Sequence, residues 1–364
     1  MKILDKYIVS KYLTTFFFCL ILFTAIVVVV DISEKTDDFT KSKLSAMQIF
    51  TEHYLGFIPR IDAMLFPLFV FISVIFFTSK MAGRSEVIAV LSSGVNYRRF
   101  MLPFLVAGFI LTGILWLGYQ YVVPNANKKW ADFEKKYIDV NMSFANPITS
   151  YKQNLYFKLD QSSFVGIRGY DTITKTGTGF FIQKFKDNKL QYNLRASNFN
   201  WDTASKKWKL TTVSERTFND INETVINSTQ KLMSYNFKPL DLRKDDYLKD
   251  QMSTPDLKQF IKMEKIRESE NISSLLVERY NRDAIPASVL ILTVIGASLA
   301  SRKVRGGSGA HIAIGVVLSM FYILLSRFSI VFATKGNFPP LVAAWMPNVI
   351  FGILALILYR RAAK

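Results

Sequence analysis

Six long apolar runs dominate this sequence of 364 residues and leave it few ways to fold. They cover residues 12–30, 61–78, 100–123, 284–300, 310–333 and 338–358. A helix rises about 1.5 Å per residue, so a run of roughly 17 to 25 apolar residues crosses a hydrocarbon core of about 30 Å. We therefore predict a membrane α-helical protein with six transmembrane helices.

A polar stretch, residues 124–283, separates the third run from the fourth and is long enough to form a domain. Polar and apolar residues alternate with a period of two in "NLYFKLD", "SFVGIRGYD" and "GFFIQKFKD", and two further strand-like segments follow at 189–202 and 206–218. This pattern predicts an inserted antiparallel all-β domain. The pattern alone leaves a sandwich, a jelly roll or an open barrel as alternatives.

The strands end before Thr254, Pro255 and Asp256, which together predict a helix start with a hydroxyl cap and proline at the first helical position. We expect this connecting helix to consist of several short segments that lead to the fourth apolar run. The chain then divides into residues 1–123 with three transmembrane helices, 124–253 with the β domain, 254–283 with the connecting helix, and 284–364 with the other three helices.

The net charge of +18 is concentrated in alternate short loops. The basic residues concerned are Lys2, Lys6, Lys11, Lys80, Arg84, Arg98, Arg99, Arg302, Lys303, Arg305, Arg360, Arg361 and Lys364. Because cytoplasmic loops carry an excess of Lys and Arg, we predict that both termini are cytoplasmic and that the polar stretch lies outside. The basic composition then reflects membrane topology rather than nucleic-acid binding. The first run lacks a small-residue cleavage site, so we expect it to be retained as an anchor.

The residues that carry metal, redox or nucleotide chemistry are scarce. Cys19 is the one cysteine and lies inside the first apolar run, while His53 and His311 fall in different loops. We therefore expect neither an intrachain disulfide nor a metal site. The sequence has no G-x-x-x-x-G-K-[ST] pattern and no evident nucleophile–base pair, so we expect no cofactor and no enzymatic activity in this chain.

Ionisable side chains at membrane depth cost about 3 kcal/mol each on insertion scales, so they are candidates for function. The predicted topology places several at the outer ends of the spans: Lys35, Lys41, Arg60, Asp62, Arg327 and Lys335. Taken singly, the simplest interpretation is an ion pair of Arg60 or Arg327 with Asp62. Taken together, the cations are suited to bind the phosphates of an anionic lipid head group.

The segment "SKMAGRSEVIAVLSSGVNYRRF" joins the second run to the third. Ser85 can cap a helix, Glu86 complements the dipole of its first turn, and Gly94 predicts its end. Between them lies an apolar stripe formed by Val87, Ile88, Val90 and Leu91. We predict a short helix over residues 85–94 at the cytoplasmic surface, where a partner protein can bind Glu86 and the apolar stripe. The alternative is a helix that merely rests on lipid, although anionic lipids repel Glu86.

Four segments of the sequence resemble one known family in their order and spacing. They are "RSEVIAVLSSGVNYRRF", "VVPNANKKW", "YNRDAIPASVLILTVIGASLASR" and "FPPLVAAWMPNVIFGILAL". The family is LptF/LptG, the permeases of lipopolysaccharide export, and the resemblance covers essentially the whole chain. The amino end, "ILDKYIVSKYL", with Val30 and Asp31 closing the first run, is more similar to the LptG branch than to the LptF branch.

The resemblance implies a permease subunit of an ABC transporter in the bacterial inner membrane. Such a subunit extracts lipopolysaccharide from the outer leaflet and passes it to a periplasmic β-bridge, and its β domain is a periplasmic jelly roll. ATP hydrolysis would be supplied by a separate LptB-like ATPase dimer. A paralogous LptF-like permease and an LptC-like protein would be further partners.

The resemblance also implies roles for individual residues. Glu86 matches the family's acid that docks into the ATPase, within the coupling helix that also contains Ser85, Val87, Ile88, Val90 and Leu91. Lys35 matches a family lysine at the outer end of the first span, whereas Glu34 and Val28 stand where well-known members have basic residues. The alternative is an ABC permease for another lipid or lipoprotein substrate, although such proteins usually carry their large outer domain after the first span.

Overall fold

The computed structural model describes residues 3–42, 44–138, 151–160, 162–171, 174–187, 189–219, 222–235, 237–242, 248–266, 272–302 and 308–362. The chain forms two compact units. The first, the helical unit, contains residues 1–133, 249–257 and 273–364. The second, the β unit, contains residues 134–248 and 258–272.

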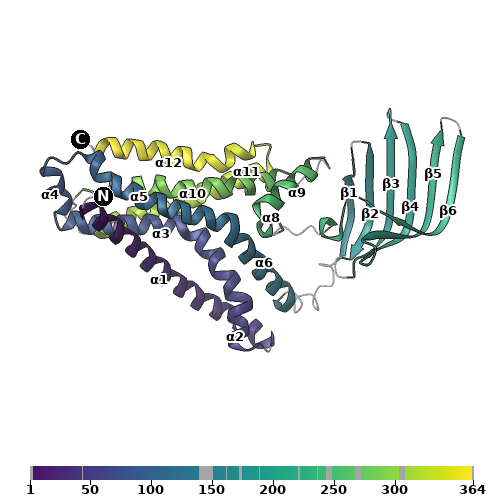
Figure 1. Ribbon diagram of the computed structural model, residues 1–364, viewed down its shortest axis with the longest axis horizontal. Coiled ribbons are helices and arrows are strands. Elements are labelled where there is room, and N and C mark those ends of the chain that lie inside the picture. The colour runs from purple at the N-terminus through teal and green to yellow at the C-terminus, as the bar shows by residue number, and fades with distance from the viewer. Residues whose placement is uncertain are drawn as a thin grey trace. The chain divides into compact units, whose positions relative to one another are not determined.

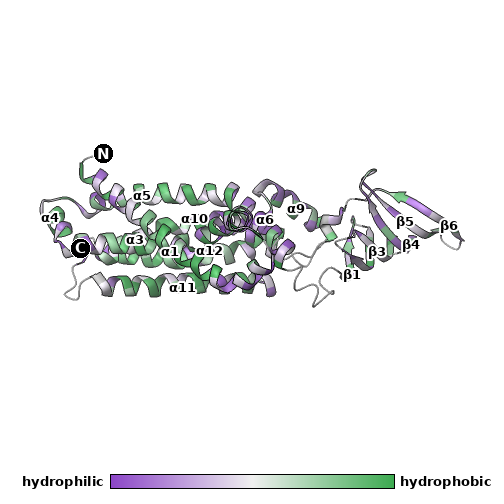
Figure 2. Cartoon of the chain, turned by 90° about the horizontal axis from the view of Figure 1, so that it is seen from below, coloured by the Kyte–Doolittle hydropathy of each residue, from purple (hydrophilic) through white to green (hydrophobic). Residues whose placement is uncertain are grey.

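The helical unit contains six helical segments that are long and apolar enough to cross a membrane, which confirms the predicted transmembrane fold (Figures 1 and 2). Its long helices are α1 (Ile3–Ser42), α3 (Leu55–Gly83), α5 (Tyr97–Leu117), α10 (Ile272–Ala300), α11 (Ser308–Lys335) and α12 (Pro340–Ala362). A short α2 (Ala46–Ile49) and a π-helical turn (Phe50–Tyr54) lead into α3, and a second π-helical turn (Gly118–Val122) joins α5 to α6 (Val123–Phe133).

Helix α3 lies at the centre of the helical unit. Its Phe69, Phe71 and Val74 belong to a core shared with Phe104 of α5 and Leu292 of α10. The two helices α3 and α10 come very close: a Cβ atom built on Gly296 of α10 would lie 2.4 Å from a Val74 methyl group. Glycine at this position therefore permits the close contact.

The start of α1, the end of α12 and the short helix α4 (Glu86–Ser92) lie at one end of the helical unit, which we call the α4 end (Figure 1). Helix α2 and the end of α6 lie at the other end, which we call the α6 end. The third transmembrane segment continues past the apolar run through α6, because Val123, Ala126 and Ala131 are buried along it. The β unit accordingly begins at Glu134 rather than at residue 124.

The described residues of the β unit form one antiparallel sheet of six strands, which confirms the inserted β domain. The strands are β1 (Tyr151–Lys158), β2 (Ser163–Asp171), β3 (Thr176–Lys186), β4 (Lys189–Asp202), β5 (Lys207–Asn219) and β6 (Asn222–Met233). They pair in chain order as a meander, so the described strands lack the crossover connections of a Greek-key jelly roll. The core is aromatic: Trp208 is fully buried beside Tyr170 and Phe199, and its indole N–H donates to the carbonyl of Phe237 over 2.9 Å.

Two short helices return the chain toward the fourth span, α8 (Leu248–Gln251) and α9 (Thr254–Ile266). The predicted cap is wrong by one residue, since Ser253 exchanges hydrogen bonds with the backbone and carboxylate of Asp256. Thr254 is the first helical residue, and its hydroxyl instead accepts a hydrogen bond of 3.0 Å from the buried guanidinium of Arg282. The fourth span is one continuous helix that begins at Ile272.

Candidate functional site

Helix α4 occupies the connection between α3 and α5, as the sequence predicted. Ser85 precedes its first residue but does not cap it with its side chain, so the predicted hydroxyl cap is wrong. The tight turn out of α3 places Ser85 in the left-handed region (φ 61°), and its backbone carbonyl, not its hydroxyl, accepts the bond from Ala89 that opens the helix. At the other end Gly94 has φ +84° and donates to the carbonyl of Leu91, which confirms the predicted stop.

The apolar residues of α4 divide between two faces. Val87 is only 1% exposed and belongs to the helical core, and Val90 and Leu91 pack partly buried against that core. Ile88, in contrast, is 52% exposed. Three of the four predicted stripe residues therefore pack α4 against its own chain, and Ile88 is the stripe residue that stays exposed.

Glu86 contacts two residues that the sequence did not relate to it. The hydroxyl of Tyr7 in α1 donates to its carboxylate over 3.3 Å, and a guanidinium nitrogen of Arg84 lies 3.9 Å from the same carboxylate. Nearby, Asp5 of α1 and Arg99 of α5 form a bidentate ion pair with distances of 2.8 and 2.7 Å. Asp5 and Tyr7 lie in the amino-terminal segment that carries the family resemblance, but nothing local in that segment indicates these contacts.

At the α6 end, Trp130 of α6 brings two of the predicted head-group residues together. The guanidinium carbon of Arg60 lies 3.6 Å from the centre of the Trp130 ring, and the amine of Lys35 lies 6.0 Å from it. Both distances fall within the range of cation–π attraction. We call Lys35, Arg60 and Trp130 the Trp130 cluster. It joins α1, α3 and α6 and brings two cations to one aromatic ring.

A buried polar group lies along the same part of α1. His53 is completely buried, and its Nε2 is 2.9 Å from the Asp31 carboxylate, which also accepts a hydrogen bond of 3.1 Å from the hydroxyl of Tyr54. The amine of Lys35 lies 3.9 Å from Asp31, and Phe57 stacks on the imidazole ring. The sequence placed His53 in an outer loop without a role. In the sequence, this buried polar group is indicated only by Asp31, an aspartate directly after the first apolar run.

The other predicted head-group residues have separate surroundings. Asp62 accepts a hydrogen bond of 2.7 Å from Thr24 of α1, in place of the predicted arginine partner. Arg327 of α11 contacts the sulfur of Met64 at 3.2 Å. Lys41 and Lys335 are exposed in the last turns of α1 and α11. Of the six residues predicted to contact a head group, Lys35 and Arg60 are thus the pair that one side chain brings together.

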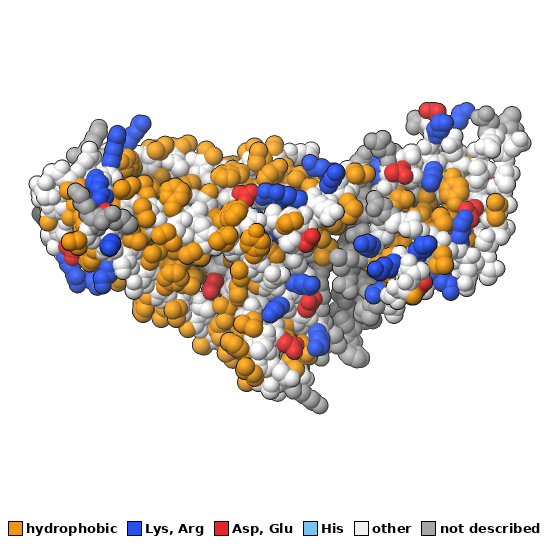
Figure 3. All heavy atoms as spheres, in the orientation of Figure 1, with side chains coloured by type: hydrophobic (Ala, Val, Ile, Leu, Met, Phe, Trp, Pro, Cys, Tyr) orange, Lys and Arg blue, Asp and Glu red, His pale blue; other side chains and the backbone are white. Residues whose placement is uncertain are grey.

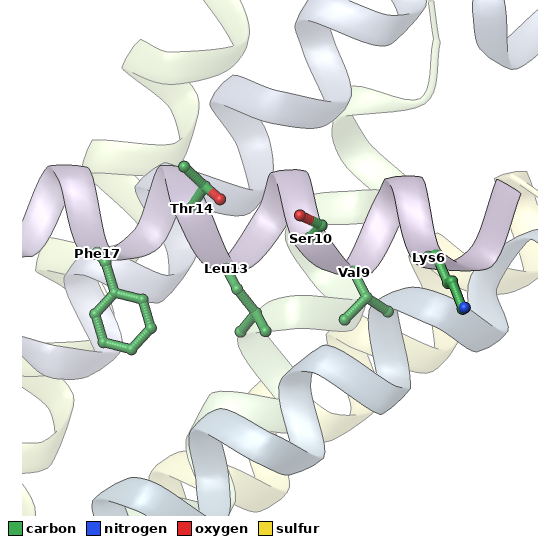
Figure 4. Close-up of a pocket in the computed structure, with 6 residues that line it drawn as sticks. All are labelled: Lys6, Val9, Ser10, Leu13, Thr14 and Phe17. Atoms are coloured by element: carbon green, nitrogen blue, oxygen red, sulfur yellow. The ribbon is translucent and has the colours of Figure 1, made fainter. Parts of the chain in front are cut away.

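Charged side chains are distributed unevenly over the helical unit. On the face shown in Figure 3, apolar side chains cover its middle, and Lys and Arg side chains gather toward its two ends. A groove of about 480 Å³ lies along the first turns of α1 near the α4 end (Figure 4). It is lined by Lys6, Val9, Ser10, Leu13, Thr14 and Phe17, which all belong to α1. Among the described residues, no group of three or more His, Cys, Asp or Glu side chains is arranged to hold a metal ion.

In the part of the chain that the structure describes, six long apolar helices with an antiparallel β domain inserted after the third define a multi-pass membrane protein. The family model of the lipopolysaccharide export system permease LptF/LptG matches residues 6–361, so the chain belongs to this family. Two relatives are the lipopolysaccharide export system permease proteins LptG of Escherichia coli strains K12 and O6:H1. Each is 21% identical over 366 aligned positions, which cover 99% of this chain and 98% of the relative.

Proposed function

We propose that this chain is one permease subunit of an ABC transporter that extracts lipopolysaccharide from the outer leaflet of the inner membrane. The lipid passes to a periplasmic β-bridge, and a separate ATPase supplies the energy. The observation that carries the proposal is the position of two charged sites on one helix. The first turns of α1 contact Glu86 of α4, and the same helix carries Lys35 into the Trp130 cluster near its other end.

The charge distribution supports a cytoplasmic α4 end. Lys80, Arg84, Arg98 and Arg99 flank α4, and Arg360 and Arg361 lie in the last turn of α12 at the same end. An excess of Lys and Arg at one end of the spans is typical of cytoplasmic loops. This orientation places both termini in the cytoplasm and the β unit in the periplasm.

The exposed face of α4 suits a docked ATPase. A helix held by Val87 and presenting Ile88 and Glu86 offers one apolar and one anionic contact on a rigid support. Because the sequence contains no phosphate-binding loop, we assign ATP hydrolysis to an LptB-like dimer. In this arrangement the permease converts movement of α4 into movement of its transmembrane helices and does no bond chemistry.

A second permease is needed to form the lipid cavity. The α1 groove of about 480 Å³ lies near the α4 end, which this orientation places at the cytoplasmic side, so it does not hold a lipid of the outer leaflet. We therefore assign the lipid cavity to the space between this chain and a paralogous, LptF-like permease, and we expect an LptC-like protein to receive the lipid.

The experiment that tests the proposal is replacement of the native gene by a Glu86→Lys variant. The variant is expected to reach the membrane at the wild-type level and to fail in export, so that lipopolysaccharide accumulates in the inner membrane. Asp37→Lys, at an acidic position of α1 away from α4, is the matched control and is expected to export normally. Normal export by Glu86→Lys would overturn the coupling role.

The substrate is tested separately by purification in mild detergent. Recovery of an ATPase and a second six-span chain, together with bound lipopolysaccharide, is the expected result. Recovery of the same subunits with a different lipid or a lipoprotein would instead support the alternative of an ABC permease for another substrate.

A further inference from the structure

The first turns of α1 contact three neighbouring elements at the α4 end. Asp5 is only 5% exposed, and its two carboxylate oxygens accept hydrogen bonds from the two terminal nitrogens of Arg99, the third residue of α5. Two residues later, the hydroxyl of Tyr7 donates to Glu86 of α4. The ring of Tyr7 lies edge-on to Phe77 of α3, with ring centres 6.3 Å apart. One short segment therefore links α1 to α3, α4 and α5.

The two polar contacts differ in strength. The pair of Asp5 and Arg99 is bidentate and charge-assisted, with distances of 2.8 and 2.7 Å, which is the strong form of such a bond. The contact from Tyr7 to Glu86 measures 3.3 Å, longer than the usual O–H···O distance of about 2.7–2.8 Å. The ion pair of Asp5 and Arg99 thus fixes α1 against α5. The hydrogen bond from Tyr7 is weaker, and its acceptor Glu86 stays partly exposed.

We propose that Tyr7 is a positioning residue for Glu86, and that the Asp5–Arg99 pair in turn positions Tyr7. Glu86 then presents its carboxylate to the ATPase in a defined orientation, which lowers the entropy lost on docking. The inference rests on the proposed function, because it specifies how the docking acid of α4 is prepared for its partner. Neither Asp5, Tyr7 nor Arg99 needs to touch the ATPase itself.

Removing one hydroxyl tests the role of Tyr7 with little risk to folding. Affinity of the purified ATPase is measured for the detergent-solubilised permease complex carrying Tyr7→Phe, Glu86→Gln or both. Tyr7→Phe is expected to weaken binding about two- to tenfold, the usual effect of losing one hydrogen bond. If Tyr7 acts through Glu86, the double variant binds no more weakly than Glu86→Gln alone. Tyr121→Phe, at an exposed tyrosine elsewhere in the chain, is the matched control.

The Asp5–Arg99 ion pair is tested by Arg99→Lys, which keeps the positive charge and loses the bidentate geometry. It is expected to weaken ATPase binding in the same direction as Tyr7→Phe, and to lose this effect in the Glu86→Gln background. Arg98→Lys, at the exposed neighbouring arginine, is the control and is expected to bind normally.

The outcomes separate the inference from the function on which it rests. Additive effects of Tyr7→Phe and Glu86→Gln, or wild-type binding by Tyr7→Phe, would overturn the positioning role and leave the docking role of Glu86 intact. Wild-type binding by Glu86→Gln itself would overturn the docking role of Glu86, and the positioning role with it, while the proposed function is tested separately by the export and purification experiments above.

Discussion

The guanidinium group of Arg60 lies over the ring of Trp130, 3.6 Å from its centre. Arg60 belongs to α3 and Trp130 to α6, and Lys35 of α1 approaches the same ring to 6.0 Å. Two like charges near each other repel, and the electron-rich ring reduces that cost by attracting both. The indole thus allows two cations to lie close together, which is the arrangement that the proposed binding of an anionic phosphate requires.

Replacing Trp130 by leucine should weaken lipid binding while leaving both cations in the chain. A cation–π contact at a partly exposed site is worth about 0.5–1 kcal/mol, so we expect about a two- to fivefold loss of lipopolysaccharide binding. Binding is measured by photo-crosslinking from a probe introduced at Ile32, an exposed residue one turn before Lys35 in α1. Trp345→Leu, at an exposed tryptophan of α12, is the control and should bind as the wild type does. Unchanged crosslinking in Trp130→Leu would show that the ring does not organise the site.

The Asp31–His53 pair should contribute to stability. His53 is fully buried and Asp31 nearly so, and Tyr54 donates to the same carboxylate. Hydrogen bonds to charged groups contribute about 1.5–3 kcal/mol each, so Asp31→Asn should lower the unfolding free energy by roughly that amount. Thermal unfolding of the purified protein in detergent measures the change. Asp37→Asn, at an acidic position farther along α1, should unfold at the wild-type temperature. Equal unfolding temperatures for Asp31→Asn and the wild type would contradict this prediction.

The elements that the sequence predicted well are those whose signal is local. Each apolar run is visible by itself, and the stop at Gly94 needs only a residue that tolerates positive φ. The alternation of strands also predicted the inserted sheet. Its meander order could not be read from the pattern, because alternation shows which residues share a face and not which strands are neighbours.

The contacts at the candidate sites were harder to predict because they join residues far apart in the chain. The segment with Trp130 was noticed only for its family resemblance, and no local feature relates it to Arg60. The stripe on α4 shows a second limit. Val87 and Ile88 are both apolar and both belong to the predicted stripe. Packing against the core buries Val87 and leaves Ile88 exposed, which the sequence pattern does not show.

Asp250 of α8 should make stability depend on pH. Burial, and next the nearby Glu278 carboxylate, raise the pKa of Asp250 to about 7, although Lys249, Arg60 and Arg282 oppose the shift. In the unfolded chain this carboxyl has its ordinary pKa of 3.8, so between about pH 4 and pH 7 the folded state binds more protons. Stability should therefore fall as the pH rises through this window.

An Asp250→Asn variant should lose this dependence and be more stable than the wild type above pH 7. The measurement is the unfolding temperature in detergent from pH 5 to pH 8. Asp132→Asn, at an exposed aspartate of α6, should keep the wild-type profile. A profile that is the same for Asp250→Asn and the wild type would show that another group is responsible.

Substitutions at two adjacent residues of α4 should separate folding from docking. Val87 is buried in the helical core, so Val87→Lys places an unpaired charge there and should lower the amount of folded permease in the membrane. Ile88 is more than half exposed, so Ile88→Lys should leave the amount of folded permease unchanged. It should nevertheless weaken ATPase docking, since a charge replaces an apolar contact at the centre of the exposed face.

Both quantities are measured on the same samples, by quantifying monodisperse permease after size-exclusion chromatography and the ATPase recovered with it. Ala89→Ser, a small change on the exposed side of the same helix, is the control for general disturbance of α4. If Ile88→Lys retains the full amount of ATPase, the exposed face of α4 is not the docking surface, and Glu86 must act by another route. If Val87→Lys folds normally, α4 is held less firmly than its packing against the core indicates.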